Sequence, residues 1–303
     1  MKTLVTGASS LPGYRTVKAA LDRGHQAVAV YMQNPIIMED EKLERVRLDI
    51  TDREALHKLL AKEKPDIVLH MAALGDVDLC EKDKVLAWKT NVQATVDLVS
   101  SLPHPPPFVL YLSTDYVFDG ERGHYAESDP PNPVDYYGLT KLMGEVICDS
   151  GTPECAIVRA SSIYGLGPGR SNFAKFIIDK LSIGETVKAL TDQYTSPSQA
   201  STLAEAIMEI AEAKLKGIFH ITGERMRRYE FAVMLAEKLG FDKSLIKQAS
   251  MGDMKWYAKR PRDSSLVSEA TRGLLRTDFH STERAFDALE KEYMTEKKLG
   301  DVS

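Results

Sequence analysis

A tyrosine and a lysine four positions apart, Tyr137 and Lys141, are the residues best suited to chemistry. Residues four apart on a helix share a face, so a helix that begins near Asp135 would hold both side chains one turn apart. A neighbouring ammonium lowers the pKa of a phenol because it favours the phenolate, and Tyr137 would then donate a proton near neutral pH. The hydroxyl of Thr114, at the end of an apolar segment, is placed to hold a carbonyl oxygen beside that phenol.

The start of the chain predicts a unit that binds a dinucleotide. Residues 2–6 indicate a buried strand, 14–23 a helix that ends at Gly24, and 26–31 a second strand. In such a unit the first turn and the helix N-terminus direct backbone N–H groups at a pyrophosphate. The Ser10 hydroxyl is a further donor to a phosphate. The alternative is a turn that binds nothing. The residues expected at the cofactor in this turn are Gly7, Ser9, Ser10, Leu11 and Gly13.

The end of the second strand favours NADP over NAD. An acidic residue there would hold the ribose 2′-hydroxyl of NAD, but the segment that begins with Tyr31 and continues Met-Gln-Asn has no carboxylate. A 2′-phosphate would meet no repulsion, and Arg15 is a candidate positive partner. Further along, the small residues Ala72 and Ala73 would let a flat cofactor lie against the backbone.

Strands and helices alternate through the first half of the chain. Thr51 and Glu54 form a capping-box pattern at the start of one helix, and His70 is expected to be a hydrogen-bonded core histidine. The alternation predicts an α/β fold with a doubly wound parallel sheet. The further strands are expected at 45–50, 67–73, 108–112 and 155–160, and helices at 51–62 and 84–101.

The second half is less regular and predicts a cap over the carboxyl edge of the sheet, where ligands bind in such folds. We expect residues 1–165 and 196–222 to form the dinucleotide-binding domain. Residues 166–195 and 223–303 would form a smaller, discontinuous substrate-binding cap. Helices are expected at 173–181, 202–215, 229–239 and 282–298, and a strand at 217–222.

The composition limits the partners. A net charge of −5 offers no basic field for nucleic acid. Cys80, Cys148 and Cys155 lack metal spacing and the histidines are scattered, so we expect no metal site and a reducing compartment. The chain starts without a signal peptide, and no apolar run approaches the roughly 18 residues of a membrane span. We therefore expect a cytoplasmic protein that binds no membrane. If the chain associates with itself, we expect a homodimer.

Several segments carry a resemblance to a known family. The spacing of Thr6, Gly7, Ser10 and Gly13 is similar to the Thr-Gly-x-x-Gly-x-x-Gly turn of extended short-chain dehydrogenases/reductases, with Ser10 in place of the middle glycine. Within that superfamily the chain resembles the dTDP-4-dehydrorhamnose reductase family along nearly its whole length. The resemblance implies reduction of a 4-keto nucleotide sugar with hydride from NADPH or NADH. The segments that carry it are 112–120, 137–145, 192–194 and 260–264.

The resemblance also implies roles for individual residues. Tyr137 would protonate the carbonyl oxygen, Lys141 would hold the nicotinamide ribose, and Thr114 would orient the carbonyl. Tyr137 and Lys141 would both also lie at the cofactor. Asp49, followed by Ile50, would lie near the adenine. The remaining implied positions are Asn91, which bonds backbone at the centre of the sheet beside the cofactor; Asp115, Tyr116 and Asn172 near the sugar; and Arg260 or Arg262 at the diphosphate, where a guanidinium binds bidentately.

Other readings stay open. Ser162 stands where the rhamnose enzymes usually carry a tryptophan, which changes the packing surface over the sugar. A sugar-nucleotide 4,6-dehydratase would need a second carboxylate where the chain has Tyr116. A 4-epimerase would hold NAD tightly. From another class, the regulatory subunit of methionine adenosyltransferase has a similar layout and binds NADP and a partner enzyme.

Overall fold

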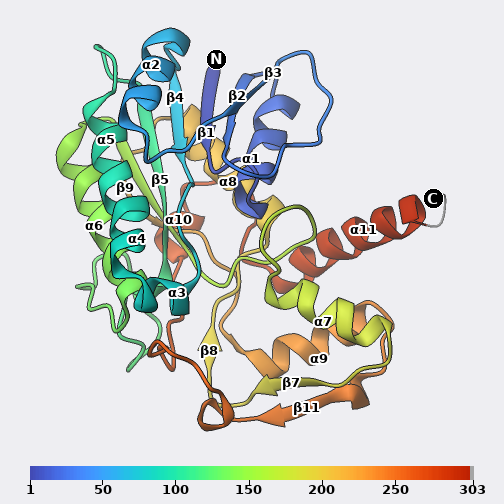
Figure 1. Ribbon diagram of the computed structural model, residues 1–303. Coiled ribbons are helices and arrows are strands. Elements are labelled where there is room, and N and C mark those ends of the chain that lie inside the picture. Colours follow the sequence, from blue (N-terminus) through green and yellow to red (C-terminus); the bar gives the residue numbers. More distant parts are fainter. Residues whose placement is uncertain (301–303) are drawn as a thin grey trace.

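A seven-stranded, all-parallel sheet forms the centre of the computed structural model, which describes residues 1–300 (Figure 1). The order β3-β2-β1-β4-β5-β6-β9 reverses at β1, so the carboxyl ends of β1 and β4 open a crevice at the switch point. This confirms the expected doubly wound sheet. In sheet order the strands are β3 (Leu43–Arg47), β2 (Gln26–Tyr31), β1 (Lys2–Thr6), β4 (Ile67–His70), β5 (Phe108–Thr114), β6 (Cys155–Ala160) and β9 (Gly217–His220).

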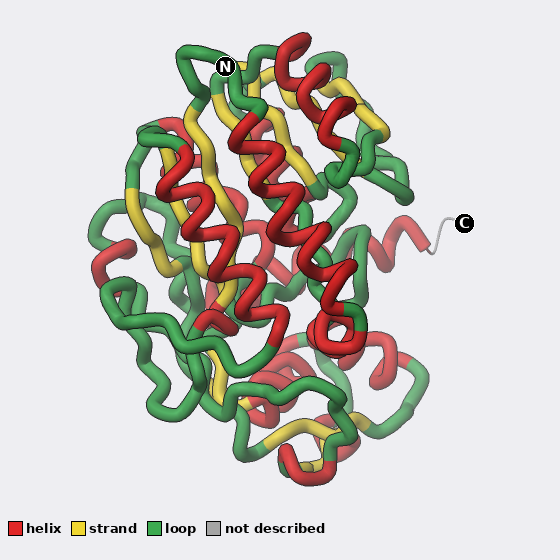
Figure 2. The backbone as a smooth tube through the Cα atoms, turned by 60° about the vertical axis from the view of Figure 1, so that its left-hand side comes forward, coloured by secondary structure: helices red, strands yellow, loops and turns green. Residues whose placement is uncertain are grey.

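The centre of the sheet is buried on both faces: every residue of β4, β5 and β6 is buried, as is typical of parallel strands covered by helices. Along β1, Leu4 packs into the core on one face and Val5 into the core on the other. Helices α1 (Leu11–Asp22) and α8 (Ala200–Glu212) cover the Val5 face. The opposite face is covered by α2 (Arg53–Glu63), α5 (Ala94–Ser100) and α6 (Tyr136–Gly151), which run beside one another in Figure 2.

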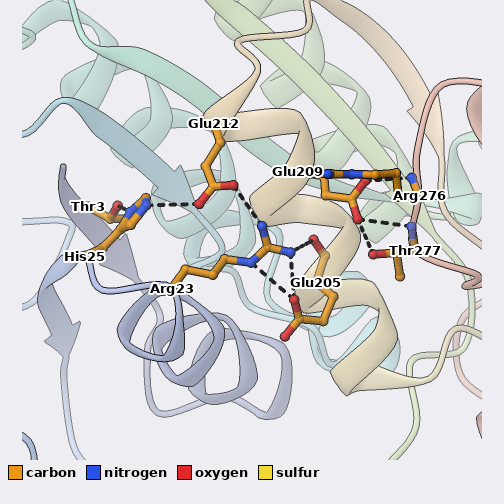
Figure 3. Close-up of polar contacts among 8 residues, drawn as sticks. All are labelled: Thr3, Arg23, His25, Glu205, Glu209, Glu212, Arg276 and Thr277. Carbon is orange, nitrogen blue, oxygen red and sulfur yellow. Dashed lines mark hydrogen bonds and ion pairs between the residues drawn. The ribbon is translucent and has the colours of Figure 1, made fainter.

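Polar contacts join α1 to α8 at the amino-terminal edge of the sheet (Figure 3). Arg23 forms ion pairs with Glu205 at 2.7 Å and with Glu212 at 2.8 Å. His25 lies between Glu212 and the Thr3 hydroxyl, 3.1 Å and 2.8 Å from them. Burial lowers the pKa of His25. The network lies at the edge opposite the carboxyl ends of the strands and therefore supports the fold.

A second lobe has its own apolar core beyond the carboxyl edge of the sheet (Figure 1). Phe231 and Leu235 of α9 are buried in it. The boundaries proposed for the cap remain a prediction. The elements that build the core are α7 (Phe173–Ser182), β7 (Val187–Leu190), α9 (Arg228–Lys238), β11 (Ile246–Ala249) and α11 (Thr282–Gly300).

Some elements differ from the expectations. The third strand covers 43–47, and α2 is capped by Asp52, whose Oδ1 accepts from the Ala55 N–H at 3.0 Å. The capping box at Thr51 is therefore wrong, because the Thr51 N–H is bonded to Asp49 instead. Among residues 1–300, no helix has the length and apolarity that crossing a bilayer requires.

The single helix expected over 84–101 is interrupted: a π-helical turn, Lys89–Gln93, separates α4 (Lys84–Trp88) from α5. Short elements also went unpredicted because two to six residues carry little periodicity. These are α3 (Val77–Lys82), β8 (Tyr194–Thr195), β10 (Met226–Arg227), α10 (Glu269–Arg272) and the 3₁₀ turns Asp115–Val117, Lys243–Leu245 and Met251–Asp253, together with β7 and β11 of the second lobe.

Candidate active site

Three adjoining hollows follow the carboxyl edge of the sheet. The central pocket, about 360 Å³, is lined by Thr114, Tyr137 and Lys141. It shares Ser10 with the glycine groove, a hollow of about 410 Å³ beside the first turn of the chain. On its other side it shares Arg228 with the distal pocket, about 240 Å³, which lies against the second lobe. An elongated ligand pair can therefore meet end to end in the central pocket.

Helix α6 positions the tyrosine and the lysine. It begins at an N-cap, Asp135, whose Oδ1 accepts from the Gly138 N–H at 2.8 Å. A Cβ on Gly138 would lie 2.1 Å from the Tyr116 carbonyl oxygen, so a glycine is needed where α6 passes the end of β5. The Tyr116 and Tyr137 rings meet edge to face at 6.0 Å. This close packing brings Tyr137 and Thr114 to one pocket from segments 23 residues apart in sequence.

The acid–base properties of the pair differ from the expectation. Burial raises the pKa of Tyr137, and a hydrogen bond with the Thr114 side chain only partly opposes this shift. Burial also lowers the pKa of Lys141 to about 8. The Lys141 ammonium lies 4.0 Å from the centre of the Tyr111 ring. The expected lowering of the phenol pKa by Lys141 is therefore wrong, because burial disfavours both charged forms.

A buried ion pair lies behind the central pocket, between β6 and α6. Arg159 of β6 donates to both carboxylate oxygens of Glu145, from Nε at 2.9 Å and from Nη2 at 2.7 Å. The side chains are 2% and 4% exposed. Ser113 also donates to Glu145. Because Ser113 precedes Thr114 and Glu145 lies one turn after Lys141, this cluster ties together the elements that carry the reactive side chains.

The glycine groove fits a dinucleotide. Gly7 has φ +66°, and a Cβ on it would lie 2.7 Å from the Ala72 Cα, so a side chain has no room there. A Cβ on Gly13 would lie 2.2 Å from the Gly7 carbonyl oxygen, which brings α1 close against the turn. Such close approach of a turn and a helix N-terminus is typical of a site where backbone N–H groups bind a diphosphate. The expected residues that line the groove are Gly7, Ser9, Ser10, Tyr31, Asp49, Ile50, Ala72 and Ala73, while Leu11 lines the central pocket.

Ser10 has a structural use in this turn. Its hydroxyl donates to the Gly7 carbonyl at 2.7 Å and accepts from the Gly13 N–H at 3.2 Å, which makes it the N-cap of α1. The hydroxyl proton expected to reach a phosphate is therefore already engaged. His70, between the Thr6 and Thr95 hydroxyls, is the hydrogen-bonded core histidine expected.

Two of the expected site residues lie elsewhere. Arg15 forms an ion pair with Glu292 at 3.0 Å, donates to the Leu166 carbonyl at 2.7 Å and lines none of the three hollows. Arg262 is exposed and lines none of the three hollows, whereas Arg260 lines the distal pocket. Both corrections depend on side-chain direction, which local sequence does not specify.

Asn91 and Asn172 have structural partners. The Asn91 side chain accepts from the Leu74 N–H at 2.7 Å and donates to the Thr140 hydroxyl at 2.9 Å, so it fixes backbone beside the groove. Asn172 caps α7 and lines the central pocket. The contacts that place both side chains beside the hollows therefore also stabilise the fold.

The substrate side of the central pocket is polar. Asp115 is buried and accepts from Ser161 at 2.7 Å and from Ser264, and burial raises its pKa. Arg228, which the sequence did not single out, donates to Gln193 at 2.8 Å and to Ser162 at 3.2 Å. The only local signal for Arg228 was its position in a basic run, with Arg225 and Arg227, before a helix.

The distal pocket combines an aromatic ring with positive charge. Arg260 is paired with Asp78 at 2.9 Å and lies 5.5 Å from the centre of the Trp256 ring. Lys188 and Arg228 also line the pocket. An aromatic surface beside guanidinium groups suits a base attached to a phosphate.

Comparison with known proteins supports one family. Residues 1–295 match the model described as RmlD substrate binding domain. The probable low-salt glycan biosynthesis reductase Agl14 of Haloferax volcanii is 35% identical over 96% of this chain and 97% of its own. A crystal structure titled as a hypothetical dTDP-4-dehydrorhamnose reductase from Sulfolobus tokodaii superposes with a TM-score of 0.82 at 38% identity, covering 92% of this chain and 97% of the other. The beta subunit of methionine adenosyltransferase 2 of Bos taurus is 29% identical over 88% of this chain and 80% of its own.

Proposed function

The chain belongs to the family described as RmlD substrate binding domain, and we propose that it reduces the keto group of a nucleotide sugar, a dTDP- or other NDP-4-keto-6-deoxysugar, with NADPH. It is an NAD(P)-dependent oxidoreductase of the extended short-chain dehydrogenase/reductase superfamily. The observation that carries the proposal is the meeting of Thr114, Tyr137 and Lys141 in a pocket between the glycine groove and the distal pocket.

The chain supplies the proton and the orientation. A bound nicotinamide dinucleotide supplies the hydride that reaches the carbonyl carbon. The Tyr137 hydroxyl donates a proton to the carbonyl oxygen, and the Thr114 hydroxyl orients that oxygen. Because burial raises the pKa of Tyr137, the phenol keeps its proton until negative charge develops on the oxygen. The Lys141 ammonium holds the ribose.

The glycine groove would hold the cofactor. Gly7 and Gly13 leave space at the first turn of α1, and Asp49 and Ala72 line the adenosine side. The preference for NADPH rests on the absence of a carboxylate from the segment that begins at Tyr31 and ends at 34. Arg15 plays no part in this preference, because it is paired with Glu292.

The distal pocket would hold the nucleotide. Arg228 lines both the central and the distal pocket, so its guanidinium is placed to bind the diphosphate that joins sugar and base. Trp256 offers a ring for the base to stack on. The small Ser162 is bonded to Arg228, which makes this wall of the sugar site polar.

A non-catalytic binding role is the second candidate, favoured by the similarity to the methionine adenosyltransferase 2 beta subunit. A dehydratase is less well supported, because Tyr116 stands where the second carboxylate would be needed. An epimerase would be purified with stoichiometric NAD.

NADPH oxidation with a panel of NDP-4-keto-6-deoxysugars tests the proposal. Tyr137→Phe should lower kcat by about 10²- to 10⁴-fold and leave the Kd for NADPH unchanged. Tyr136→Phe is the matched control, since Tyr136 is the neighbouring phenol on α6 and lines none of the three hollows. Equal turnover by Tyr137→Phe and the wild type would refute the role of Tyr137. Tight NADPH binding without turnover of any sugar would favour the binding role.

A further inference from the structure

A glycine-rich segment crosses the start of α1. We call residues 165–171 the strap. Its glycines at 165, 167 and 169 have φ of +152°, +138° and +102°, conformations that other residues rarely adopt. A Cβ on Gly169 would lie 3.0 Å from the Leu11 nitrogen and 3.1 Å from the Ser10 Cα. The strap therefore lies directly on the turn whose backbone N–H groups would face a diphosphate.

The first half of the strap is held firmly. The Leu166 N–H donates to Glu292 at 3.0 Å, and the Leu166 carbonyl accepts from Arg15 at 2.7 Å. The Gly165 carbonyl accepts from the Asn172 side chain at 2.8 Å. These contacts fix the base of the strap against α1 and α11, so a movement of the strap would be confined to the residues around Gly169.

The second half is held by an exposed contact across the central pocket. Arg170 donates from Nη1 to the Gly75 carbonyl at 3.0 Å and pairs through Nη2 with Asp76 at 3.2 Å. The two side chains are 65% and 38% exposed. An ion pair this exposed contributes little stability. The guanidinium can therefore exchange this carboxylate for a more highly charged anion at small cost.

Lys89 also lines the glycine groove, but the polar side chains nearest the first turn, Ser10 and Arg15, are already engaged. The Ser10 hydroxyl is engaged as the N-cap, and Arg15 is neutralised by Glu292. Lys141 lies over the Tyr111 ring. Arg170 is the residue that follows Gly169, and it lines the central pocket together with Ser10.

We propose that Arg170 is a ligand of the cofactor diphosphate: it leaves Asp76 and Gly75, binds the diphosphate bidentately, and thereby closes the strap over the bound dinucleotide. A planar guanidinium with two parallel donors suits two phosphate oxygens. The inference rests on the proposed function, since it needs a dinucleotide in the glycine groove.

Equilibrium titration of the purified protein with ADP-ribose, NADPH and NADH, without sugar, tests the inference. Arg170→Ala should weaken all three by a similar factor, about 10- to 100-fold for a lost charged hydrogen-bonding pair. Adenosine 2′-monophosphate, which lacks a diphosphate, should bind both proteins equally. Arg284→Ala is the matched control, because Arg284 has the same kind of exposed pair, 70% and 38% exposed, on α11.

Asp76→Asn tests the exchange itself. The Asp76 Oδ1 also caps α3 by accepting from the Leu79 N–H at 3.0 Å, and asparagine keeps this cap. Removing the competing charge should tighten ADP-ribose binding by up to about fivefold. Weaker binding in Asp76→Asn would overturn the exchange.

The remaining outcomes separate the two proposals. ADP-ribose affinity unchanged by Arg170→Ala overturns the inference and leaves the proposed function intact. If Arg170→Ala weakens the binding of NADPH alone, Arg170 contacts the 2′-phosphate, and the inference is also overturned. A wild-type protein that binds no nicotinamide dinucleotide overturns the proposed function, and the inference falls with it.

Discussion

Removing one partner of the buried pair Arg159–Glu145 should cost far more than removing both. The pair is 2% and 4% exposed and joined by two hydrogen bonds of 2.9 and 2.7 Å. Breaking such a pair leaves an uncompensated charge and costs about 3–5 kcal/mol, whereas its replacement by apolar residues of similar volume is often neutral. We therefore expect about 3–5 kcal/mol for each single variant and a near-native free energy of unfolding for Arg159→Met with Glu145→Leu.

The two single variants should differ from one another. In Arg159→Met, Glu145 still accepts a hydrogen bond from Ser113. In Glu145→Leu, the guanidinium loses its carboxylate partner and keeps the contact with the face of the Phe118 ring, 5.1 Å from its centre. Its Nη1 already finds no hydrogen-bond partner within the part of the chain that the structure describes. Glu145→Leu should therefore be the more costly of the two.

This double-mutant cycle is measured by urea unfolding at pH 7, followed by circular dichroism, for the wild type, the two single variants and the double variant. The double variant should show a coupling energy of several kcal/mol relative to the sum of the singles. Turnover of the double variant reports separately on positioning, because Ser113 adjoins Thr114 and Glu145 lies one turn from Lys141. Single variants that each cost less than about 1 kcal/mol and add without coupling would refute the reasoning.

Gly7→Ala should lower the free energy of unfolding by at least about 1–2 kcal/mol because of the left-handed backbone, and by more because of the contact with Ala72. Gly184 has φ +75° but open space around it, so Gly184→Ala should show the backbone cost alone. Equal losses of stability in thermal unfolding of the two variants would contradict this. Lys141 has its pKa lowered to about 8 by burial, so NADPH affinity should fall as the pH rises through 8 and the ammonium is lost. Lys141→Arg should not show that fall. A wild-type affinity for NADPH that stays constant up to pH 9 would contradict the role of the Lys141 ammonium. Burial lowers the pKa values of His70 and His220 to about 3 and about 4. The unfolded chain therefore binds protons first below about pH 6.5, and the free energy of unfolding should drop towards pH 4 by up to about 1.4 kcal/mol per pH unit for each histidine. In urea titrations at several pH values, His70→Gln should reduce the dependence of the free energy of unfolding on pH. An unchanged pH dependence would show that His70 does not contribute to it.

Features that depend on near neighbours in the chain were readable from the sequence. The strands at 2–6, 26–31 and 155–160 have the bounds expected, because each has apolar residues at its centre and turn residues nearby. The α6 helix starts where Asp135 can cap it. The spacing of Tyr137 and Lys141 placed both on that helix, and the glycine turn placed a groove at the start of α1.

The tertiary structure decided which charges meet and how buried they are. Arg15 turned to Glu292 on the last helix and Arg262 to solvent, while Arg228 entered the pocket from the second lobe. The pKa of Tyr137 rises because distant segments remove water from its hydroxyl, although its sequence neighbour Lys141 suggested the opposite. Helix and strand formation follow from local periodicity, but side-chain direction, ion pairing and desolvation depend on segments that only the fold brings together, such as those of Arg15 and Glu292.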